Sequence, residues 1–189
     1  RGTATSEATS DSMALVAGSN FIRATRDAGY RSTTAAVAEL VDNSIQAGAC
    51  SIRVFVQESS GASGRELSLA VLDDGSGMAP ETLRRALQFG GSSRFGDRSG
   101  IGRFGMGLPN SSVSQARRLE VLSWQSPSSI WGCYLDVDEL VEKADDGIPP
   151  SYAAEIPDWV AAYAATHGTL VIWSRCDRFG VRKGSTLAV

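Results

Sequence analysis

The apolar residues of this chain are spaced in two ways, one typical of strands and one typical of helices. Alternating or continuous apolar runs predict strands at 50–57, 67–73, 118–125, 130–137 and 169–175. Helical spacing and helix-start signals predict helices at 33–47, 80–89, 108–117 and, as a short helix, 158–166. Ser32 or Thr33 can cap the first helix, Gly48 follows its end, and Pro80 suits the first position of the second.

The order of these elements predicts the fold class. Helices and strands are mixed, and several strands follow one another without an intervening helix, which favours an α+β fold over a doubly wound parallel one. We therefore expect a two-layer α/β sandwich with a mixed, largely antiparallel sheet. One domain is expected over 18–189, after a mobile N-terminal tail at 1–17, and the proline-bearing stretch 143–157 is expected to be irregular.

Composition limits the class of protein further. The chain has 189 residues, of which 42% are hydrophobic and 21% charged, as suits one globular domain. A net charge of −3 argues against a surface built throughout for nucleic acid, although it allows a local basic patch. The three cysteines are far apart and form no CxxC pair, so neither a zinc site nor a disulfide framework is indicated. No apolar run approaches the roughly 20 residues of a membrane span, and we expect a cytoplasmic protein without membrane contact.

The predicted helix 33–47 carries a polar stripe. Its members follow i, i+4 and i+7 spacing with one neighbour beside them: Glu39, Asn43, Gln46 and Asp42. The opposite, apolar stripe is expected to pack on the sheet and consists of Val37, Leu40, Val41 and Ile45. The amide oxygen of Asn43 is a hard ligand suited to Mg²⁺ shared with phosphates, and the Glu39 carboxylate can orient and deprotonate a water. From this segment alone, a solvated polar face explains the stripe equally well.

A second motif, Asp73-Asp74-Gly75-Ser76-Gly77-Met78, directly follows an apolar strand. A strand end holds a carboxylate in a fixed place, and the glycines let a ligand approach the backbone closely. A carboxylate acceptor there would suit the exocyclic amine of adenine, which is a donor. The alternative is a tight turn that contains Asp-Gly, and such turns are common.

Residues 90–107 hold seven glycines, which resist regular structure and indicate a mobile loop. The segment ends in Gly102-Arg103-Phe104-Gly105-Met106-Gly107, directly before a predicted helix. Free backbone N–H groups and the positive end of the helix dipole make such a junction suitable for phosphate, although a flexible surface loop is the usual alternative. The spacing is neither the Rossmann nor the Walker A pattern. Gly168-Thr169 at the start of the last strand is not specific by itself.

The order and spacing of these four signals are more specific than any one of them. Glu-x-x-Asp-Asn on a helix, Asp-x-Gly-x-Gly after a strand, a loop ending Gly-x-x-Gly-x-Gly, and Gly-Thr at a late strand resemble the nucleotide-binding motifs of the GHKL superfamily. That group holds gyrase B, the ninety-kilodalton heat-shock chaperone, MutL and MORC proteins. The resemblance covers roughly residues 20–175 and implies the Bergerat fold, in which ATP lies between the sheet, its helices and a lid.

By this resemblance, ATP and Mg²⁺ are the expected cofactors. Glu39 would be the general base, Asn43 the Mg²⁺ ligand and Asp73 the acceptor of the adenine amine, with Thr169 in the hydrogen-bond network around it. The residues expected to contact the nucleotide or its metal are Asn43, Gln46, Asp73, Gly75, Gly77, Met78, Gly102, Gly105, Gly107 and Thr169. Since histidine kinases usually carry Asn in place of Glu39, an ATPase is favoured. His167, the only histidine, is expected to be structural.

Within the superfamily, the stretches around Glu39 and at 90–94 look similar to MORC-type proteins or to stand-alone bacterial ATPases. Leu108-Pro109-Asn110 departs from the lysine that many MORC-type proteins carry after the lid. GHL ATPases also use a lysine from a following transducer domain, and the chain stops at Val189 without one. We therefore expect a fragment of a longer protein, with slow turnover in isolation.

The resemblance implies Mg-dependent ATP binding and hydrolysis, with ATP and ADP as ligands and an ATP-dependent homodimer or conformational switch. Nucleic acid is a partner by analogy only. Two alternatives stay open: an ATP-sensing regulatory module without turnover, and a catalytic domain of the histidine-kinase or pyruvate-dehydrogenase-kinase type.

Overall fold

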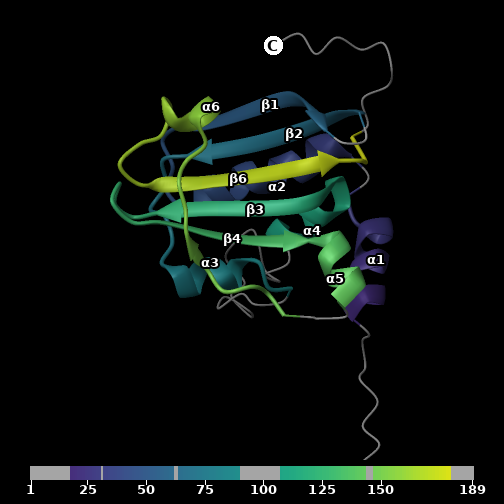
Figure 1. Ribbon diagram of the computed structural model, residues 1–189. Helices are drawn as coiled ribbons and strands as arrows, with labels where there is room; N and C mark the ends of the chain where they lie inside the picture. The colour runs from purple at the N-terminus through teal and green to yellow at the C-terminus, as the bar shows by residue number, and fades with distance from the viewer. Residues whose placement is uncertain (1–17, 31, 62–63, 90–106, 144–146, 180–189) are drawn as a thin grey trace, which may run out of the picture.

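Residues 18–30, 32–61, 64–89, 107–143 and 147–179 are described in the computed structural model of this chain, and they form one sheet with helices around it (Figure 1). The strands of these residues are β1 (Ile52–Gly61), β2 (Gly64–Asp73), β3 (Ala116–Trp124), β4 (Ile130–Asp136), β5 (Tyr152–Ala153) and β6 (Gly168–Cys176). Their order across the sheet is β1-β2-β6-β3-β4-β5, and each described pair is antiparallel. β6, the last of them in the chain, therefore lies between β2 and β3.

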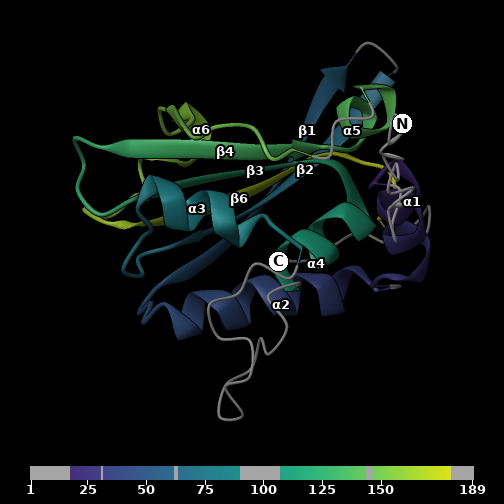
Figure 2. The ribbon, with the colours of Figure 1, turned by 90° about the horizontal axis from the view of Figure 1, so that it is seen from below.

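The helices cover the two faces and one end of this sheet. In the described ranges they are α1 (Gly18–Ala28), α2 (Thr33–Gln46), α3 (Pro80–Ala86), α4 (Gly107–Gln115), α5 (Val137–Lys143) and α6 (Asp158–Ala161). Figure 2 shows α2, α3 and α4 on one face, α6 on the other, and α1 and α5 together at one end. The predicted α+β class is therefore confirmed, with α2, α3 and α4 as the helical layer on one face and the four-residue α6 on the other, and the pairings among described strands are all antiparallel.

Side chains that alternate along the strands form two cores, one on each face of the sheet. The core beneath α2, α3 and α4 includes Leu40, Leu69, Val71, Leu83, Leu119, Val121 and Trp173. The core beneath α6 includes Ala70, Leu72, Leu122, Trp124, Val160, Leu170 and Ile172. Because both faces of β2 and β6 are covered, their sequences are continuous apolar runs without the alternation of a half-exposed strand.

The bounds of α2 agree closely with the prediction, but its buried stripe differs from the predicted one. Ser32 caps the helix by accepting a hydrogen bond from the Ala35 N–H at 3.4 Å. The buried stripe is Ala36, Leu40 and Ser44. Ile45, which the pattern predicts to face the sheet, is 59% exposed, so that prediction was wrong. Consecutive helical positions are about 100° apart, and because Ser44 faces the sheet, Ile45 is turned away from it.

The sequence pattern does not predict α1 or α5. On the inward face of α1, Ile22 is 6% and Arg26 7% exposed. A buried arginine counts as polar in the pattern, so the apolar stripe of α1 is too short to recognise. The charge of Arg26 is compensated inside the protein: it donates to the carbonyl oxygens of Val113 at 2.9 Å and Ala116 at 2.7 Å, and it pairs with Asp177 at 2.7 Å.

Several boundaries also differ from the predicted ones: β1 extends to Gly61, α3 ends at Ala86, and α6 covers only Asp158–Ala161. β5 lies inside the stretch 143–157 that the prolines predict to be irregular. The predicted tail at 1–17 and the glycine-rich loop through 106 lie outside the described residues. No helix within the described ranges has the length and apolar character needed to cross a membrane.

Candidate functional site

Three neighbouring strands bring Asp73, Thr169 and Ser123 into one row. Asp73 on β2 lies opposite Thr169 on β6, and Thr169 lies opposite Ser123 on β3. The three residues are 6%, 8% and 0% exposed, in that order. They share the face of the sheet that α2 covers, because Val71 and Val171, two positions along the same strands, belong to the core beneath that helix. The predicted pair Asp73 and Thr169 is therefore brought together.

The Asp73 carboxylate is the centre of a hydrogen-bond network. Its Oδ1 accepts from the backbone N–H groups of Gly75 at 2.9 Å and Thr169 at 3.2 Å. Its Oδ2 accepts from the Ser44 hydroxyl at 2.8 Å. Burial raises the pKa of Asp73, and the hydrogen bonds from Gly75, Ser44 and Thr169 oppose that rise. Because a carboxylate oxygen can accept two hydrogen bonds, Oδ2 keeps capacity for one donor from a ligand.

The loop after β2 closes over the end of this row. Gly77 has a φ of +66°, and a Cβ there would overlap the Trp124 carbonyl oxygen, so both its conformation and its surroundings require glycine. The Met78 N–H donates to Ser123 Oγ at 2.8 Å, and Ser123 Oγ lies 2.9 Å from Thr169 Oγ1. Ser123 thus joins two residues that the sequence predicted, Met78 and Thr169.

Two further contacts support this loop. The His167 ring donates from Nδ1 to the carbonyl oxygen of Gly75 at 2.7 Å, in keeping with the structural role expected for that histidine. The Asp74 carboxylate accepts from the N–H groups of Ser51 at 2.8 Å and Cys50 at 2.7 Å. The hydrogen bond from Ser51, and then that from Cys50, lower the pKa of Asp74. The loop between β2 and α3 is therefore fixed from both sides.

The polar stripe of α2 is more open than the Asp73 row. Glu39, Asp42 and Asn43 are half-buried, and Gln46 in the last turn is exposed. Glu39 Oε2 accepts a hydrogen bond from the Tyr30 hydroxyl at 3.1 Å. The i, i+4 spacing that the sequence predicts for Glu39 and Asn43 is realised, since both belong to one uninterrupted helix.

The first residue of α4 lies directly against Glu39. A Cβ at Gly107 would overlap Glu39 Oε1, so a larger residue there would displace the Glu39 carboxylate. Gly107 is also the first residue of α4, where backbone N–H groups have no partner within the helix. The structure therefore brings together Glu39 and Gly107, two of the residues that the sequence predicts for the site. Gly102 and Gly105 lie outside the described residues.

One helix connects the two groups of residues. Ser44 on α2 contacts Asp73, and Glu39 lies five positions earlier on the same helix. Five residues correspond to about 7.5 Å along a helix axis. α2 therefore fixes the spacing between the buried carboxylate of Asp73 and the half-buried carboxylate of Glu39.

The sequence does not predict Ser44, Ser123 or Tyr30 as site residues. For Ser44 the sequence does contain a signal. It lies four positions after Leu40, so helical spacing places this small polar residue on the same buried side of α2. Ser123 and Tyr30 have no local signal. Their partners in the site are 46 and 9 positions away, so only the fold brings them to it.

The donor groups of α2 limit the kind of metal site that is possible. The described part of the chain holds no group of three or more His, Cys, Asp or Glu side chains placed for a metal ion. Asn43 offers one hard amide oxygen, on the same stripe as the carboxylates of Glu39 and Asp42. This donor set fits a magnesium ion that takes its other ligands from phosphate oxygens and water.

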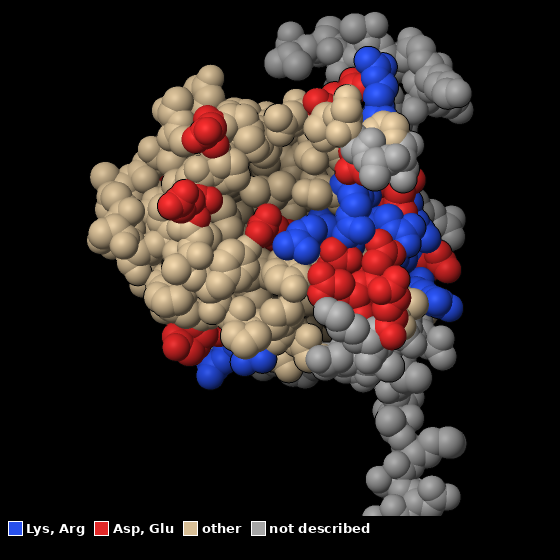
Figure 3. Space-filling view, viewed as in Figure 1, with Lys and Arg blue, Asp and Glu red and all other residues tan. Residues whose placement is uncertain are grey.

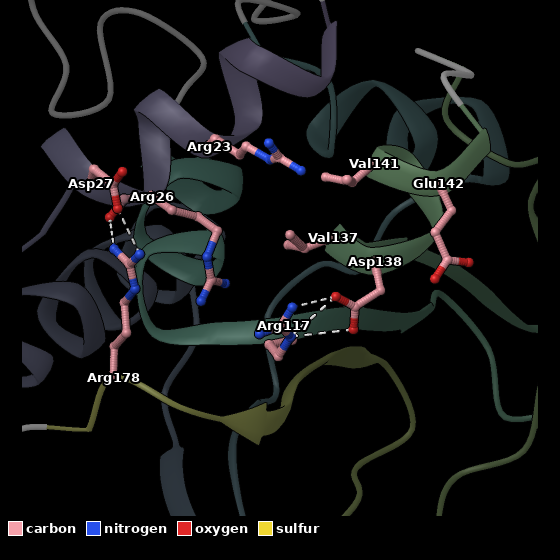
Figure 4. Close-up of a pocket in the computed structure, with 9 residues that line it drawn as sticks. All are labelled: Arg23, Arg26, Asp27, Arg117, Val137, Asp138, Val141, Glu142 and Arg178. Atoms are coloured by element: carbon pink, nitrogen blue, oxygen red, sulfur yellow. Dashed lines mark hydrogen bonds and ion pairs between the residues drawn. The ribbon is translucent and has the colours of Figure 1, made fainter.

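A separate hollow of about 280 Å³ lies between α1, α5 and β3 (Figure 4). It is lined by Arg23, Arg26, Asp27, Arg117, Val137, Asp138, Val141, Glu142 and Arg178, none of which is a predicted site residue. Three of its four arginines are paired with acids: Arg26 with Asp177, Arg117 with Asp138 and Arg178 with Asp27. Figure 3 shows the same mixture of both charges at this end of the sheet. Such compensation identifies an ion-pair cluster that joins elements of the fold.

Comparison with known proteins agrees with this geometry. A family profile described as "Histidine kinase-, DNA gyrase B-, and HSP90-like ATPase" matches residues 30–169. The matched range begins at Tyr30 and ends at Thr169, and thus contains both the Asp73 row and the polar stripe of α2. Together, the fold and the match define a GHKL-type ATPase domain. The chain belongs to the family of histidine kinase-, DNA gyrase B- and HSP90-like ATPases, and the resemblance inferred from the motifs is confirmed.

A curated relative supports the MORC-like character of the domain. Protein MICRORCHIDIA 6 from Arabidopsis thaliana is 37% identical to the chain over 94 residues. The alignment covers 48% of this chain and 14% of that protein. The chain therefore corresponds to a small part of this relative's length.

Proposed function

We propose that this domain binds ATP together with Mg²⁺ and hydrolyses it, at a site between the Asp73 row, the polar stripe of α2 and the start of α4. The observation that carries the proposal is the placement of two carboxylates beside α2: Glu39 belongs to the helix, and Asp73, at the end of β2, accepts a hydrogen bond from Ser44 on the same helix. The buried one, Asp73, is held by hydrogen bonds, and the half-buried one, Glu39, lies against Gly107. The family match supports ATP as the nucleotide.

At the adenine end, Asp73 accepts the exocyclic amine of the base in this proposal. Thr169 and Ser44 hold the carboxylate from two sides, which fixes the direction of its remaining lone pairs. Gly75 and Gly77 shape the backbone around the base, and Met78, half-buried beside the core, lines it. Guanine presents a carbonyl oxygen where adenine presents the amine, so Asp73 would select against it.

At the phosphate end, Glu39 acts as the general base, which orients the attacking water and accepts its proton. Asn43 would hold Mg²⁺ through its amide oxygen, with Gln46 next along the same stripe. When bound, Mg²⁺ would supply positive charge that offsets the charge developing on the transferred phosphoryl group. The N–H groups at Gly107 and those of Gly102 and Gly105 are proposed to donate to the phosphates.

For the longer protein, we propose that the ATP-binding domain spans 18–189 and that ATP drives homodimerisation or a conformational switch. The length of the microrchidia relative, of which the alignment covers 14%, supports additional domains. A cytoplasmic location is proposed because Cys50, Cys133 and Cys176 are all free thiols.

Calorimetric titration and a phosphate-release assay test this proposal. The chain should bind ATP in the presence of Mg²⁺, and the full-length protein should release phosphate in a reaction that EDTA abolishes. Asn43→Ala should weaken magnesium-dependent binding about tenfold or more, because it removes the protein's ligand to the ion. Gln57→Ala, on the exposed surface of β1, is the matched control and should leave binding unchanged. Absence of ATP binding would refute the proposal, whereas binding without phosphate release would limit the domain to a nucleotide sensor.

A further inference from the structure

Tyr30 occupies the segment between α1 and α2 and reaches the polar stripe of α2. Its hydroxyl donates to Glu39 Oε2 at 3.1 Å, across nine positions of sequence. The ring is half-buried and packs against the core beneath the helices. Burial raises the pKa of Tyr30, and the charge of Glu39 and the hydrogen bond to it raise the pKa further. The hydroxyl therefore stays protonated, and able to donate, throughout the neutral pH range.

A buried glutamine holds the backbone of Tyr30 in place. Gln115, at the end of α4, is 1% exposed, and its Nε2 donates to the Tyr30 carbonyl oxygen at 2.7 Å. Its Oε1 accepts from Thr33 Oγ1 at 2.8 Å, in the first turn of α2. Gln115 thus ties three elements together: the segment that carries Tyr30, the helix that carries Glu39, and the helix that begins at Gly107.

The two oxygens of Glu39 have different surroundings. Oε2 accepts from Tyr30, whereas Oε1 lies against Gly107 at the start of α4. A half turn of the carboxylate about its last bond would only exchange two equivalent oxygens, whereas a partial rotation would break the hydrogen bond to Tyr30 and turn the other oxygen away from Gly107. Both ends of α4 contribute to this arrangement, Gly107 by direct contact and Gln115 through Tyr30.

We infer that Tyr30 is a positioning residue for Glu39, holding its carboxylate so that Oε1 faces the start of α4, and that Gln115 in turn positions Tyr30. The inference rests on the proposed function, in which Glu39 is the general base. A displaced catalytic group lowers the rate steeply, by as much as about 10²-fold for 1 Å. Tyr30 touches neither the adenine end nor Asn43 among the contacts described, so its loss should affect the chemical step and spare nucleotide binding.

Tyr30→Phe in the full-length protein tests this inference, because it removes only the hydroxyl. The turnover number should fall about tenfold, while the Kd for Mg·ATP measured by calorimetry stays within about twofold. Tyr134→Phe is the matched control: the Tyr134 hydroxyl donates to Glu139 at 3.3 Å, a similar tyrosine–glutamate pair away from α2. That variant should keep both values. Gln115→Met keeps the side-chain length but loses the hydrogen bonds to Tyr30 and Thr33. It should also lower turnover, by a smaller factor than Tyr30→Phe.

Three results would be decisive. Turnover of Tyr30→Phe equal to that of Tyr134→Phe would overturn the positioning role. A rise in Kd that matches the loss of turnover, or a melting temperature well below that of Tyr134→Phe, would show a structural role instead and overturn it as well. Normal hydrolysis by Glu39→Ala would refute the general base itself, and so separates failure of the proposed function from failure of this inference.

Discussion

The two ends of the proposed nucleotide site are built differently. At the adenine end, Asp73 and Thr169 are 6% and 8% exposed, and Asp73 accepts three hydrogen bonds from the protein. At the phosphate end, Glu39 and Asn43 are half-buried on one side of α2. A flat, neutral base can be matched by a rigid, preformed surface. A triphosphate with its metal brings its own charge and ligands, and these complete an open site.

This difference predicts that substitutions at the two ends affect different steps. The adenine end should determine affinity and nucleotide choice, because its contacts exist before the ligand arrives. The phosphate end should determine the rate, because its groups act on charge that develops during the reaction.

The largest effect is expected at the phosphate end. Glu39→Gln removes the base but keeps the size of the side chain, so turnover in the full-length protein should fall by about 10²–10⁴-fold. The Kd for Mg·ATP should stay within a few-fold, since Glu39 makes no proposed contact with adenine. Phosphate release and calorimetry on the same preparation measure both values, with Glu81→Gln on the exposed side of α3 as the control. A large loss of affinity with unchanged turnover would reverse the proposed division between the ends.

At the adenine end, Asp73→Asn should weaken ATP binding by about 10²-fold. The substitution places a donor where the adenine amine needs an acceptor, inside a row that excludes water. Asp158→Asn, exposed on α6, has the same chemical change far from the site and should bind ATP normally. If calorimetry gives the two variants equal affinity, Asp73 does not contact the base.

Nucleotide choice should follow from the same carboxylate. GTP should bind about tenfold more weakly than ATP, or weaker still, because its carbonyl oxygen would face Asp73 and leave a buried acceptor unpaired. Competition between the two nucleotides for this chain measures the ratio directly. Equal affinities would exclude the proposed role of the row in recognising the base.

A smaller effect is expected at Ser44, which supports Asp73 from α2. Ser44→Ala removes the hydroxyl that donates to Asp73 Oδ2 at 2.8 Å, so the carboxylate is held less firmly. ATP affinity should fall by about three- to tenfold, while turnover at saturating ATP changes little. Ser126→Ala, in the exposed turn between β3 and β4, is the control. A change in turnover alone would link Ser44 to the phosphate end.

The smallest effect concerns stability without nucleotide. Burial raises the pKa of Asp73 above its ordinary value of 3.8, so folding favours the protonated form of this carboxyl. Its contribution to stability is fully present below pH 3.8 and is lost as the pH rises through the raised pKa. At pH 7 the ionised carboxylate therefore costs stability, and apo Asp73→Asn should melt on the order of 2 °C above the wild type. In thermal unfolding experiments, the difference in melting temperature between Asp73→Asn and the wild type should become smaller as the pH is lowered toward about 3.5. A lower melting temperature at pH 7 would mean that the hydrogen bonds to Asp73 outweigh its burial.

Much of the fold and part of the site could be predicted from local sequence alone. The 3.6-residue period places Glu39 and Asn43 on one side of α2, and Ser32 marks where that helix begins. Continuous apolar runs identify β2 and β6 as strands, and the Asp-Gly motif after β2 indicates a turn that holds a carboxylate at a strand end. Each of these inferences depends on interactions within a few residues of sequence, and such interactions act before the chain is folded.

Only the tertiary structure decided which of these residues meet. The strand order β2-β6-β3 puts Ser123 beside Thr169 and Thr169 beside Asp73, although they are 46 and 96 positions apart. The burial of Arg26 and the exposure of Ile45 both contradict their hydrophobicity, because packing against neighbours, and not side-chain type, sets which face of a helix is covered. The contacts of Tyr30 and Gly107 with Glu39 arise in the same way. A sequence pattern records the period of one element, whereas the distance between elements depends on how the whole sheet pairs and how the helices pack upon it.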